Sequence, residues 1–231
     1  GEEVTPTWVP DAADRTKLIR IWTGDIEIHI SADIAYAVWQ YWRATADEAF
    51  LLERGAEIIL ETARFWATRA EWKPESGCYE ISDVVGPDEY HDHVDNNAYT
   101  NALARWNLTV AAKLQRWLRA EHSPAWRKLN RRVKLSAHEL EAWGHVAAKL
   151  YVPHDPATRL IEQFAGYFQR TDINLPDLEP RSQSVQSLLG IEGANQTQVL
   201  KQPDVLMLMY LFPELYDAAT VRANYSYYTA R

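Results

Sequence analysis

The stretch Gly86–Asn101 reads GPDEYHDHVDNNAYTN and forms one polar block between two apolar stretches of the chain. It gathers carboxyl, imidazole and amide side chains at close spacing: Asp88, Glu89, Asp92, Asp95, His91, His93, Asn96 and Asn97. A buried carboxyl group here would need a partner or a raised pKa, which is how an active-site acid is made. A solvated helix start would carry similar residues, because Asp and Asn cap helices well. The block alone leaves both interpretations open.

The composition is that of an ordinary globular protein, with 231 residues, 47% hydrophobic and 24% charged, and a formal net charge of -8. The acidic balance argues against nucleic acid and anionic membranes as partners. Residues 1–20 lack the apolar core of a signal peptide, and no apolar run is long enough to span a bilayer. Because Cys78 is the single cysteine, an internal disulfide is excluded. We expect a cytoplasmic protein with no membrane or nucleic-acid partner.

Aromatic residues are frequent, with 10 tryptophans and 12 tyrosines. They can build a large aromatic core, or they can line a saccharide site, because flat apolar faces beside hydrogen-bonding groups suit sugar rings. We favour the core for most of them, including Trp39, Trp42 and Trp66.

Strand patterns are short. Leu18–Trp22 and Asp25–Ile30 alternate apolar and polar residues across Thr23–Gly24, which predicts a β-hairpin. Pro74–Gly77 reads as a turn, and Cys78–Val85 is a short strand-like segment that leads into the polar block.

Helical patterns cover most of the remaining chain, several of them opening on a capping signal. The expected helices are Ser31 to about Arg43, Thr45 (capping box with Glu48) through Trp66, Asn97 to about Ala120, Ser136 (capping box with Glu139) to Leu150, Lys201–Phe212 and Asp217–Tyr228. Residues 152–198 are broken by prolines and read mostly as loop with short helical pieces. Long helices joined by loops that hold the polar residues predict an all-α fold of antiparallel helical pairs. In a helical toroid of such pairs, the site lies where the loops converge at one end.

Five strings occur along the chain in this order: Asp33–Ala37 (DIAYA), Glu61–Trp66 (ETARFW), Gly86–His91 (GPDEYH), Val94–Asn101 (VDNNAYTN) and Lys201–Leu206 (KQPDVL). Together they resemble the catalytic domain of glycoside hydrolase family 65, which contains maltose, trehalose, kojibiose and nigerose phosphorylases and a smaller number of hydrolases. The resemblance extends over nearly the whole chain, most weakly between about residues 120 and 195. Pro203 is a mild departure, since the family commonly has alanine there.

The resemblance implies an all-α fold with helices of an (α/α)6 barrel, usually preceded by a large β-sandwich domain. We expect residues 1–231 to be a partial catalytic domain, with the β-sandwich and the C-terminal parts absent. Asn224–Arg231 resembles the lead-in to the family's phosphate-binding loop. Truncation at both ends predicts little activity for the fragment itself. It also predicts uncovered apolar helix faces, which a homo-oligomer or the complementary remainder of the domain would cover.

The family's general acid maps onto Glu89. Breaking a glycosidic bond requires protonation of the departing oxygen, and a carboxylic acid that keeps its proton near neutral pH can supply it. A narrow, sugar-filled pocket and the neighbouring charge of Asp88 are expected to keep that proton on Glu89. Lys201 and Gln202 match the family's pair that binds the non-reducing glucose, since their donors and acceptor suit hydroxyl groups.

The implied reaction is inverting phosphorolysis of an α-linked glucose disaccharide to β-glucose 1-phosphate and glucose. Phosphate is already anionic and attacks the anomeric carbon directly, so the substrates are the disaccharide and inorganic phosphate, with no cofactor. An inverting α-glucoside hydrolase of the same family stays open, and it would need a second carboxylate about 6.5–9.5 Å away to activate water. A non-catalytic helical sugar-binding module is a further alternative.

Structural roles compete with each assignment. Without the resemblance, Glu89 reads as a solvated loop carboxylate, and Lys201 and Gln202 as surface residues. Asp88 is expected to shape the turn after Pro87 or to bond a neighbour.

The remaining polar residues of the block are expected to support the site. His91 joins Asp88 in that role, and Asn97, with Asp95 and Asn96, is expected to cap the following helix. A metal site from Glu89, His91, Asp92 and His93 is disfavoured, because adjacent ligands point in divergent directions and no second cluster completes the set. We expect no metal.

Overall fold

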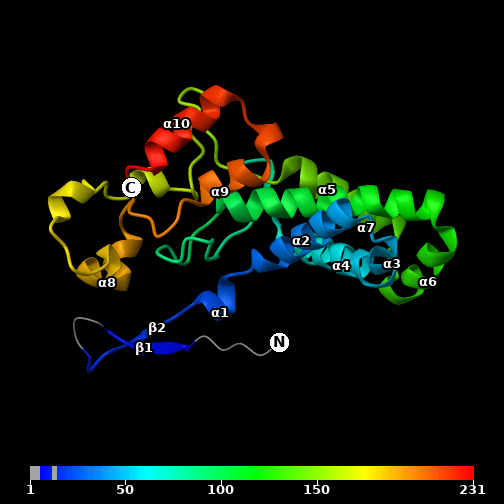
Figure 1. Cartoon of the computed structure of the whole chain (residues 1–231), viewed down its shortest axis with the longest axis horizontal. Helices are drawn as coiled ribbons and strands as arrows, with labels where there is room; N and C mark the ends of the chain where they lie inside the picture. Colours follow the sequence, from blue (N-terminus) through cyan, green and yellow to red (C-terminus); the bar gives the residue numbers. More distant parts are fainter. Residues whose placement is uncertain (1–5, 12–14) are drawn as a thin grey trace. The chain divides into compact units, whose positions relative to one another are not determined.

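The computed structural model describes residues 6–11 and 15–231. It is predominantly helical, which confirms the predicted all-α class (Figure 1). The chain divides into two compact units. We call one the helix unit, which comprises His29–Ile81 and Thr100–Tyr151, and the other the loop unit, which comprises Gly1–Ile28, Ser82–Tyr99 and Val152–Arg231.

The helix unit is built around α4 (Ala56–Arg69), which contacts α2 (Ile30–Thr45), α6 (Ser123–Val133) and α7 (Ala137–Lys149). The long helix α5 (Ala98–Glu121) continues through the same unit from Thr100 onward. Apolar side chains recur at helical spacing and are buried here: Ile59, Leu60, Ala63, Trp66, Leu103, Leu114, Leu118 and Trp143. Removing these surfaces from water is the main favourable term for this unit. Trp66 is fully buried as predicted, whereas Trp39 and Trp42 are half-buried.

Two of the predicted helix caps are wrong, although the helices exist. α2 begins at Ile30 after His29, not after a Ser31 cap. It continues to Thr45, whose hydroxyl donates to the Tyr41 carbonyl (2.8 Å). Asp47 is the cap of the next helix, since its carboxylate accepts from the Phe50 amide (2.9 Å). A stronger acceptor two residues further along therefore takes the role predicted for Thr45.

The next helix opens with the short helix α3 (Glu48–Phe50) and a π-helical turn, η1 (Leu51–Gly55), before α4. The capping box at Ser136 and Glu139 is confirmed at the start of α7. α6 was not predicted, and its N-cap residue His122 makes no side-chain cap hydrogen bond. Its buried residues are Leu129 and Val133.

The hairpin predicted across Thr23–Gly24 is misplaced. Leu18–Arg20 (β2) pairs antiparallel with Trp8–Pro10 (β1), and Thr23–Ile26 forms the short helix α1. The amides of Asp25 and Ile26 both donate to the Trp22 carbonyl at 3.0 Å, which closes a helical turn where the hairpin was expected.

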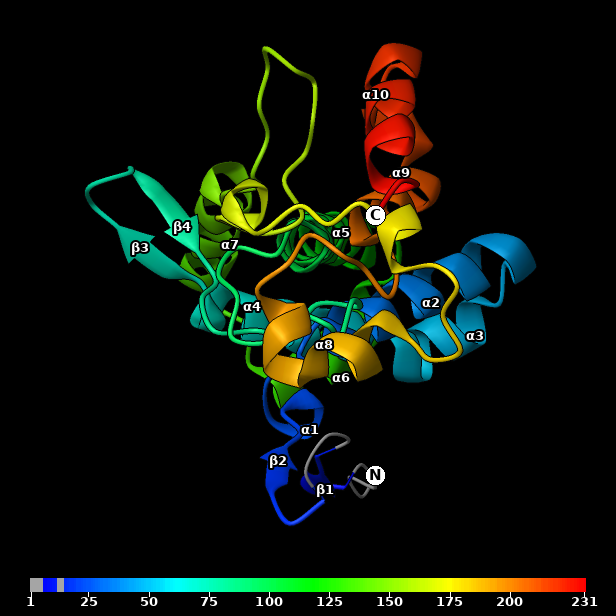
Figure 2. The same cartoon turned by 90° about the vertical axis from the view of Figure 1, so that its left-hand side faces the viewer.

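A short antiparallel hairpin is present elsewhere (Figure 2). It consists of β3 (Glu71–Lys73) and β4 (Cys78–Glu80), joined by the predicted turn Pro74–Gly77. Gly77 has a φ of 64°, a conformation that glycine adopts without a Cβ penalty.

The loop unit contains shorter helices separated by irregular chain, as predicted for residues 152–198. Its elements beyond α1 are η2 (Tyr167–Gln169), η3 (Leu175–Leu178), α8 (Val185–Asn195), α9 (Asp204–Leu211), η4 (Pro213–Leu215) and α10 (Ala218–Tyr228). Pro203 precedes the first turn of α9, and Asp217 caps α10 by accepting from the Thr220 amide (2.7 Å). The helices α9 and α10 contact each other, and apolar side chains on them are exposed, notably Tyr210 at 85%.

Among the residues the structure describes, no helix combines the length and the apolar character needed to cross a membrane.

Candidate active site

The polar block lies on a loop that two backbone hydrogen bonds close. The Val84 amide donates to the Val94 carbonyl (2.9 Å), and the Val94 amide donates to the Val84 carbonyl (3.0 Å). Both valines are buried, so the pair anchors the loop in the apolar interior of the loop unit. Two residues near the end of the loop, His93 and Asn96, have positive φ values of 52° and 54°. The loop conformation is therefore held against local backbone preference by its contacts.

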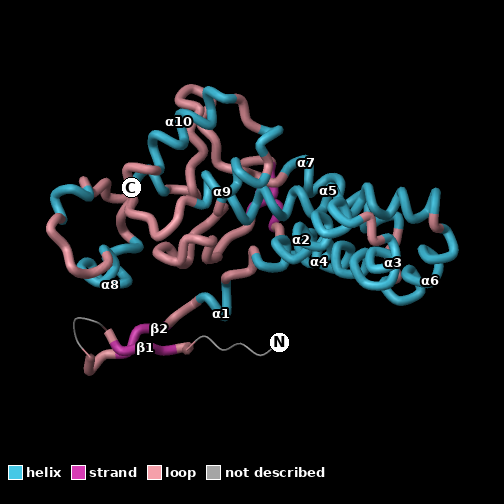
Figure 3. Tube along the Cα trace, viewed as in Figure 1, coloured by secondary structure: helices cyan, strands magenta, loops and turns pink. Residues whose placement is uncertain are grey.

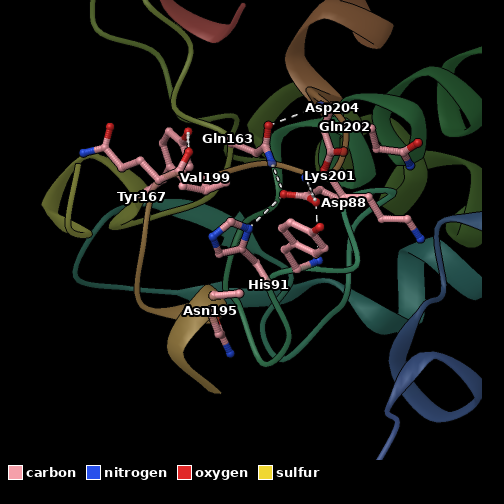
Figure 4. Close-up of polar contacts among 12 residues, drawn as sticks. Asp88, His91, Gln163, Tyr167, Asn195, Val199, Lys201, Gln202 and Asp204 are labelled. Carbon is pink, nitrogen blue, oxygen red and sulfur yellow. Dashed lines mark hydrogen bonds and ion pairs between the residues drawn. The ribbon is translucent and has the colours of Figure 1, made fainter. Parts of the chain in front are cut away.

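Asp88 is the centre of those contacts (Figure 4). Its side chain is 2% exposed. Its Oδ1 accepts from the backbone amides of Lys201 (3.0 Å) and Tyr90 (3.3 Å), and its Oδ2 accepts from Gln163 Nε2 (3.0 Å). His91 Nδ1 lies 2.9 Å from the same Oδ2. Asp88 thus bonds its neighbours as predicted, and it links three segments that are distant in the sequence.

His91 extends the network along the segment that contains Lys201. It is buried, and its Nε2 lies 2.8 Å from the carbonyl oxygen of Thr197. The ring also packs against Phe164 and Tyr167, with centroids 4.9 Å and 6.0 Å away. Burial raises the pKa of Tyr167, whose hydroxyl donates to the Gln198 carbonyl (2.7 Å). The buried Asp88 and His91 side chains thus each have polar partners, which offsets the cost of burying them.

Asn97 and Asp204 form a second buried pair beside the first. Asn97 Nδ2 donates to Asp204 Oδ2 (2.8 Å), and the Asp204 amide donates to Gln163 Oε1 (3.2 Å). A Cβ on Gly86 would lie 2.3 Å from Asn97 Nδ2 and 2.5 Å from Asp204 Oδ2. Only glycine fits at this position, because the backbone of the loop passes directly over the pair.

Glu89 lies outside this interior. Its side chain is 44% exposed, and Oε2 accepts from Lys201 Nζ at 2.8 Å. In this chain burial falls on Asp88 instead of Glu89, and the narrow pocket expected around Glu89 stays a prediction. The reason is local: four donors draw the Asp88 side chain inward, and the next side chain along the loop faces solvent.

The structure brings the sequence-predicted site residues together. Lys201 reaches Glu89 with its side chain and Asp88 with its backbone amide. Gln202 Nε2 donates to the Pro87 carbonyl of the same loop. The hydrogen bond that Lys201 donates to Glu89 raises the pKa of Lys201, so this side chain stays charged at neutral pH. The exposed Glu89 carboxylate, the Lys201 ammonium group and the Gln202 amide thus lie close together, next to the buried network of Asp88.

The other polar residues of the block diverge from Glu89. Asp92 is half-buried and accepts from Asn195 Nδ2 (2.6 Å), and burial raises its pKa. His93 Nδ1 lies 2.5 Å from Asp83 Oδ1. The Asp95 carboxylate accepts from the Asp83 amide (2.9 Å), so it ties the loop instead of capping α5. Within residues 6–11 and 15–231, no group of three or more His, Cys, Asp and Glu side chains is placed to hold a metal ion.

Three residues of the network were missed by sequence reasoning. Gln163 lies in the proline-broken region, and no motif surrounds it. Thr197 takes part through its backbone carbonyl, which no side-chain pattern reveals. Asp204 could have been found, because it belongs to the string KQPDVL in which only the Lys and Gln were given roles.

Comparison with known proteins identifies the family. A family model described as the glycosyl hydrolase family 65 central catalytic domain matches residues 1–231. The kojibiose phosphorylase of Caldanaerobacter subterraneus subsp. tengcongensis is 45% identical over 232 residues, which cover 100% of this chain and 30% of that protein. The 1,2-alpha-glucosylglycerol phosphorylase of Bacillus selenitireducens is 39% identical over 234 residues, with the same two coverages of 100% and 30%.

A solved structure agrees with the sequence relatives. It is a human-microbiome protein provisionally assigned as a kojibiose phosphorylase, with a TM-score of 0.78 and 26% identity over 87% of this chain and 27% of that one. This chain spans about 30% of the length of the curated relatives named above. With a family model that covers every residue, the chain belongs to glycoside hydrolase family 65, within its central catalytic domain.

Proposed function

We propose that the protein carrying this chain phosphorolyses an α-linked glucose disaccharide, with inversion, to β-glucose 1-phosphate and glucose. The phosphorylase names of its relatives support this reaction class. Kojibiose, in which the two glucoses are α-1,2-linked, is the first substrate to test, since one relative is a kojibiose phosphorylase and another acts on a 1,2-alpha-glucosyl compound. The cytoplasmic location stays a prediction.

In this proposal Glu89 is the general acid. Its exposed carboxyl protonates the departing glycosidic oxygen while phosphate attacks the anomeric carbon from the opposite face. Lys201 and Gln202 bind hydroxyl groups of the non-reducing glucose. The observation that carries the proposal is the 2.8 Å contact between Lys201 Nζ and Glu89 Oε2, which puts a candidate sugar-binding cation within reach of the candidate acid.

The same contact implies a change on substrate binding. Glu89 can donate its proton to the glycosidic oxygen only when its carboxyl is released from Lys201. Glucose hydroxyls that accept from Lys201 in place of Glu89 would release the carboxyl and exclude water from it. In this scheme, substrate binding therefore also frees the Glu89 carboxyl to donate its proton. The Asp88 network holds the loop backbone fixed while the two side chains separate.

The experiment uses the full-length protein with kojibiose, nigerose, trehalose and maltose, each with and without inorganic phosphate, and measures glucose and glucose 1-phosphate. We expect phosphate-dependent β-glucose 1-phosphate, with kojibiose the best substrate. Glucose release at the same rate without phosphate would replace the proposal with an inverting hydrolase. No turnover of any of the four would favour a non-catalytic sugar-binding module.

A further inference from the structure

A groove in the helix unit has a composition unlike the rest of this acidic chain. It has a volume of about 410 Å³ and lies along α6, between the last turns of α5 and the start of α7. Its polar lining comes from Gln115 and Arg119 on α5 and from Ser123, Arg127 and Asn130 on α6, with the Trp126 ring beside them. The spacing of four residues on α5, and the spacings of four and three residues on α6, place each set on one face of its helix. We call this hollow the α6 groove.

The charge of the α6 groove is entirely positive. Arg119 and Arg127 are exposed and are the charged residues of its lining, which includes no Asp or Glu although the whole chain has a net charge of -8. Arg127 Nη1 donates to Ser123 Oγ (3.3 Å), a neutral partner. Within the part of the chain that the structure describes, neither guanidinium forms an ion pair with a carboxylate. Elsewhere in the same unit, Arg64 and Arg132 are paired with glutamates.

The floor of the groove presents amide groups. Gln115 is only 3% exposed, yet in the described ranges of the chain its side-chain amide has no hydrogen-bond partner. This amide lines the groove, where a ligand can reach it. Asn130 is fixed in orientation, because its Oδ1 accepts from the Leu135 amide (2.9 Å). Its NH2 group is therefore the end left to donate to a ligand.

We propose that the α6 groove binds a small phosphate ester with a hydroxylated body, such as a hexose phosphate. Two guanidinium groups without carboxylate partners suit a phosphate, to which each can donate two parallel hydrogen bonds. The unpaired Gln115 amide and the Asn130 NH2 group suit sugar hydroxyls. The Trp126 ring offers an apolar face to the sugar ring. The volume exceeds that of a single phosphate ion and accommodates an organic body as well.

This site is separate from the proposed catalytic residues. All of its lining belongs to the helix unit, whereas Glu89, Lys201 and Gln202 belong to the loop unit. The proposal therefore does not depend on the phosphorylase reaction, and its test uses a phosphate ester that this reaction does not produce.

The experiment is isothermal titration calorimetry of the full-length protein with glucose 6-phosphate, compared with inorganic phosphate and with glucose. We expect glucose 6-phosphate to bind more tightly than either. The double variant Arg119→Gln/Arg127→Gln should weaken binding by at least about tenfold, since it removes charge-assisted hydrogen bonds. Gln115→Leu should weaken it about threefold or more, through loss of one buried amide.

Two controls make the result specific. Arg116→Gln removes an exposed arginine one turn earlier on α5 that does not line the groove, and it should change the affinity by less than about twofold. Lys201→Ala alters the proposed catalytic site and should have equally little effect. Equal losses in Arg116→Gln would mean general attraction to positive charge. The proposal would be overturned if Lys201→Ala alone weakened the binding of glucose 6-phosphate. It would also be overturned if inorganic phosphate bound as tightly as glucose 6-phosphate, or if glucose 6-phosphate did not bind at all.

Discussion

The helix unit buries leucine, isoleucine and tryptophan along regular helices, whereas the loop unit buries Asp88, His91, Gln163 and Asp204 between segments of irregular chain (Figure 3). In the first, apolar faces at helical spacing supply the stability, and backbone hydrogen bonds are satisfied within each helix. In the second, few helices are available, so side-chain donors and acceptors hold segments that lie about 75 to 113 residues apart in the sequence.

The difference shows how a loop can be made rigid enough to carry chemistry. Apolar packing alone would leave the backbone of residues 86–91 free to slide, because dispersion contacts have little direction. The four hydrogen bonds to Asp88 specify one geometry, and they fix the backbone positions of Glu89 and Lys201 while both side chains remain at the surface. We therefore expect the helix unit to be most sensitive to loss of apolar packing and the loop unit to loss of buried hydrogen bonds.

The largest change in stability is expected in the apolar core of the helix unit. Trp66→Ala removes a fully buried ring and should lower the free energy of unfolding by about 3–5 kcal/mol, as for other large core truncations. Urea denaturation followed by circular dichroism measures this. Trp72→Ala is the matched control, because Trp72 is half exposed on β3, and it should cost roughly 1 kcal/mol. Equal costs for both would show that burial does not control stability here.

In the loop unit, the corresponding change is Asp88→Asn. An amide keeps the size but turns an NH2 group toward two of the four donors, so the free energy of unfolding should fall by about 3 kcal/mol. Hydrogen exchange should accelerate in residues 82–99 and 197–204. The control is Glu89→Gln on the adjacent, exposed residue, with an expected cost under about 1 kcal/mol. A neutral Asp88→Asn would refute the polar network as the support of the loop.

Substitution by alanine should change the stability with opposite sign at two glycines, one in each unit. Gly86→Ala forces a Cβ against Asn97 and Asp204 and should destabilise by about 1–3 kcal/mol. Gly144→Ala lies in α7 with open space around the new Cβ and should stabilise by about 0.5–1 kcal/mol. Thermal unfolding of both variants measures the effect, and the same sign for both would contradict the close approach at Gly86.

The smallest effect concerns pH and the cap of α10. The hydrogen bonds from Thr220, and then the ion pair with Arg159, lower the pKa of Asp217 from 3.8 to about 2. A carboxylate with a depressed folded-state pKa contributes stability above its unfolded pKa and loses it as the pH falls toward the folded value. Asp217→Asn should therefore lower the Tm at pH 6 and leave it unchanged near pH 2. If the difference in Tm between wild type and Asp217→Asn stays constant between pH 6 and pH 2, the charge of Asp217 does not supply the stability.

Sequence reasoning succeeded in part where local chemistry decides, although the caps predicted at Ser31 and Thr45 are wrong. The Ser136–Glu139 capping box and the helix after the polar block were predicted from nearby residues, and the structure has both. It failed where distant partners decide. Leu18–Arg20 reads as half of a hairpin with the residues that follow, yet its partner strand precedes it, and local alternation cannot distinguish the two pairings.

The candidate site divides in the same way. Glu89, Lys201 and Gln202 were found through long motif strings, and the structure brings them together. The exposure of Glu89 and Lys201 was one of two open interpretations. The burial of Asp88 was not found, because it depends on Gln163 and Thr197, which come from segments without a motif. A polar residue shows its type in the sequence, but its partner is set by the tertiary fold.

The most direct test of the account is the role of Glu89. In the full-length protein, we would compare phosphorolysis of the disaccharide it cleaves with that of α-glucosyl fluoride, whose leaving group needs no proton, for wild type and Glu89→Gln. A general acid predicts a fall in kcat/KM of about 10³-fold for the disaccharide and of less than about tenfold for the fluoride. Equal losses on both substrates, or undiminished turnover of the disaccharide, would show that Glu89 does not protonate the leaving group.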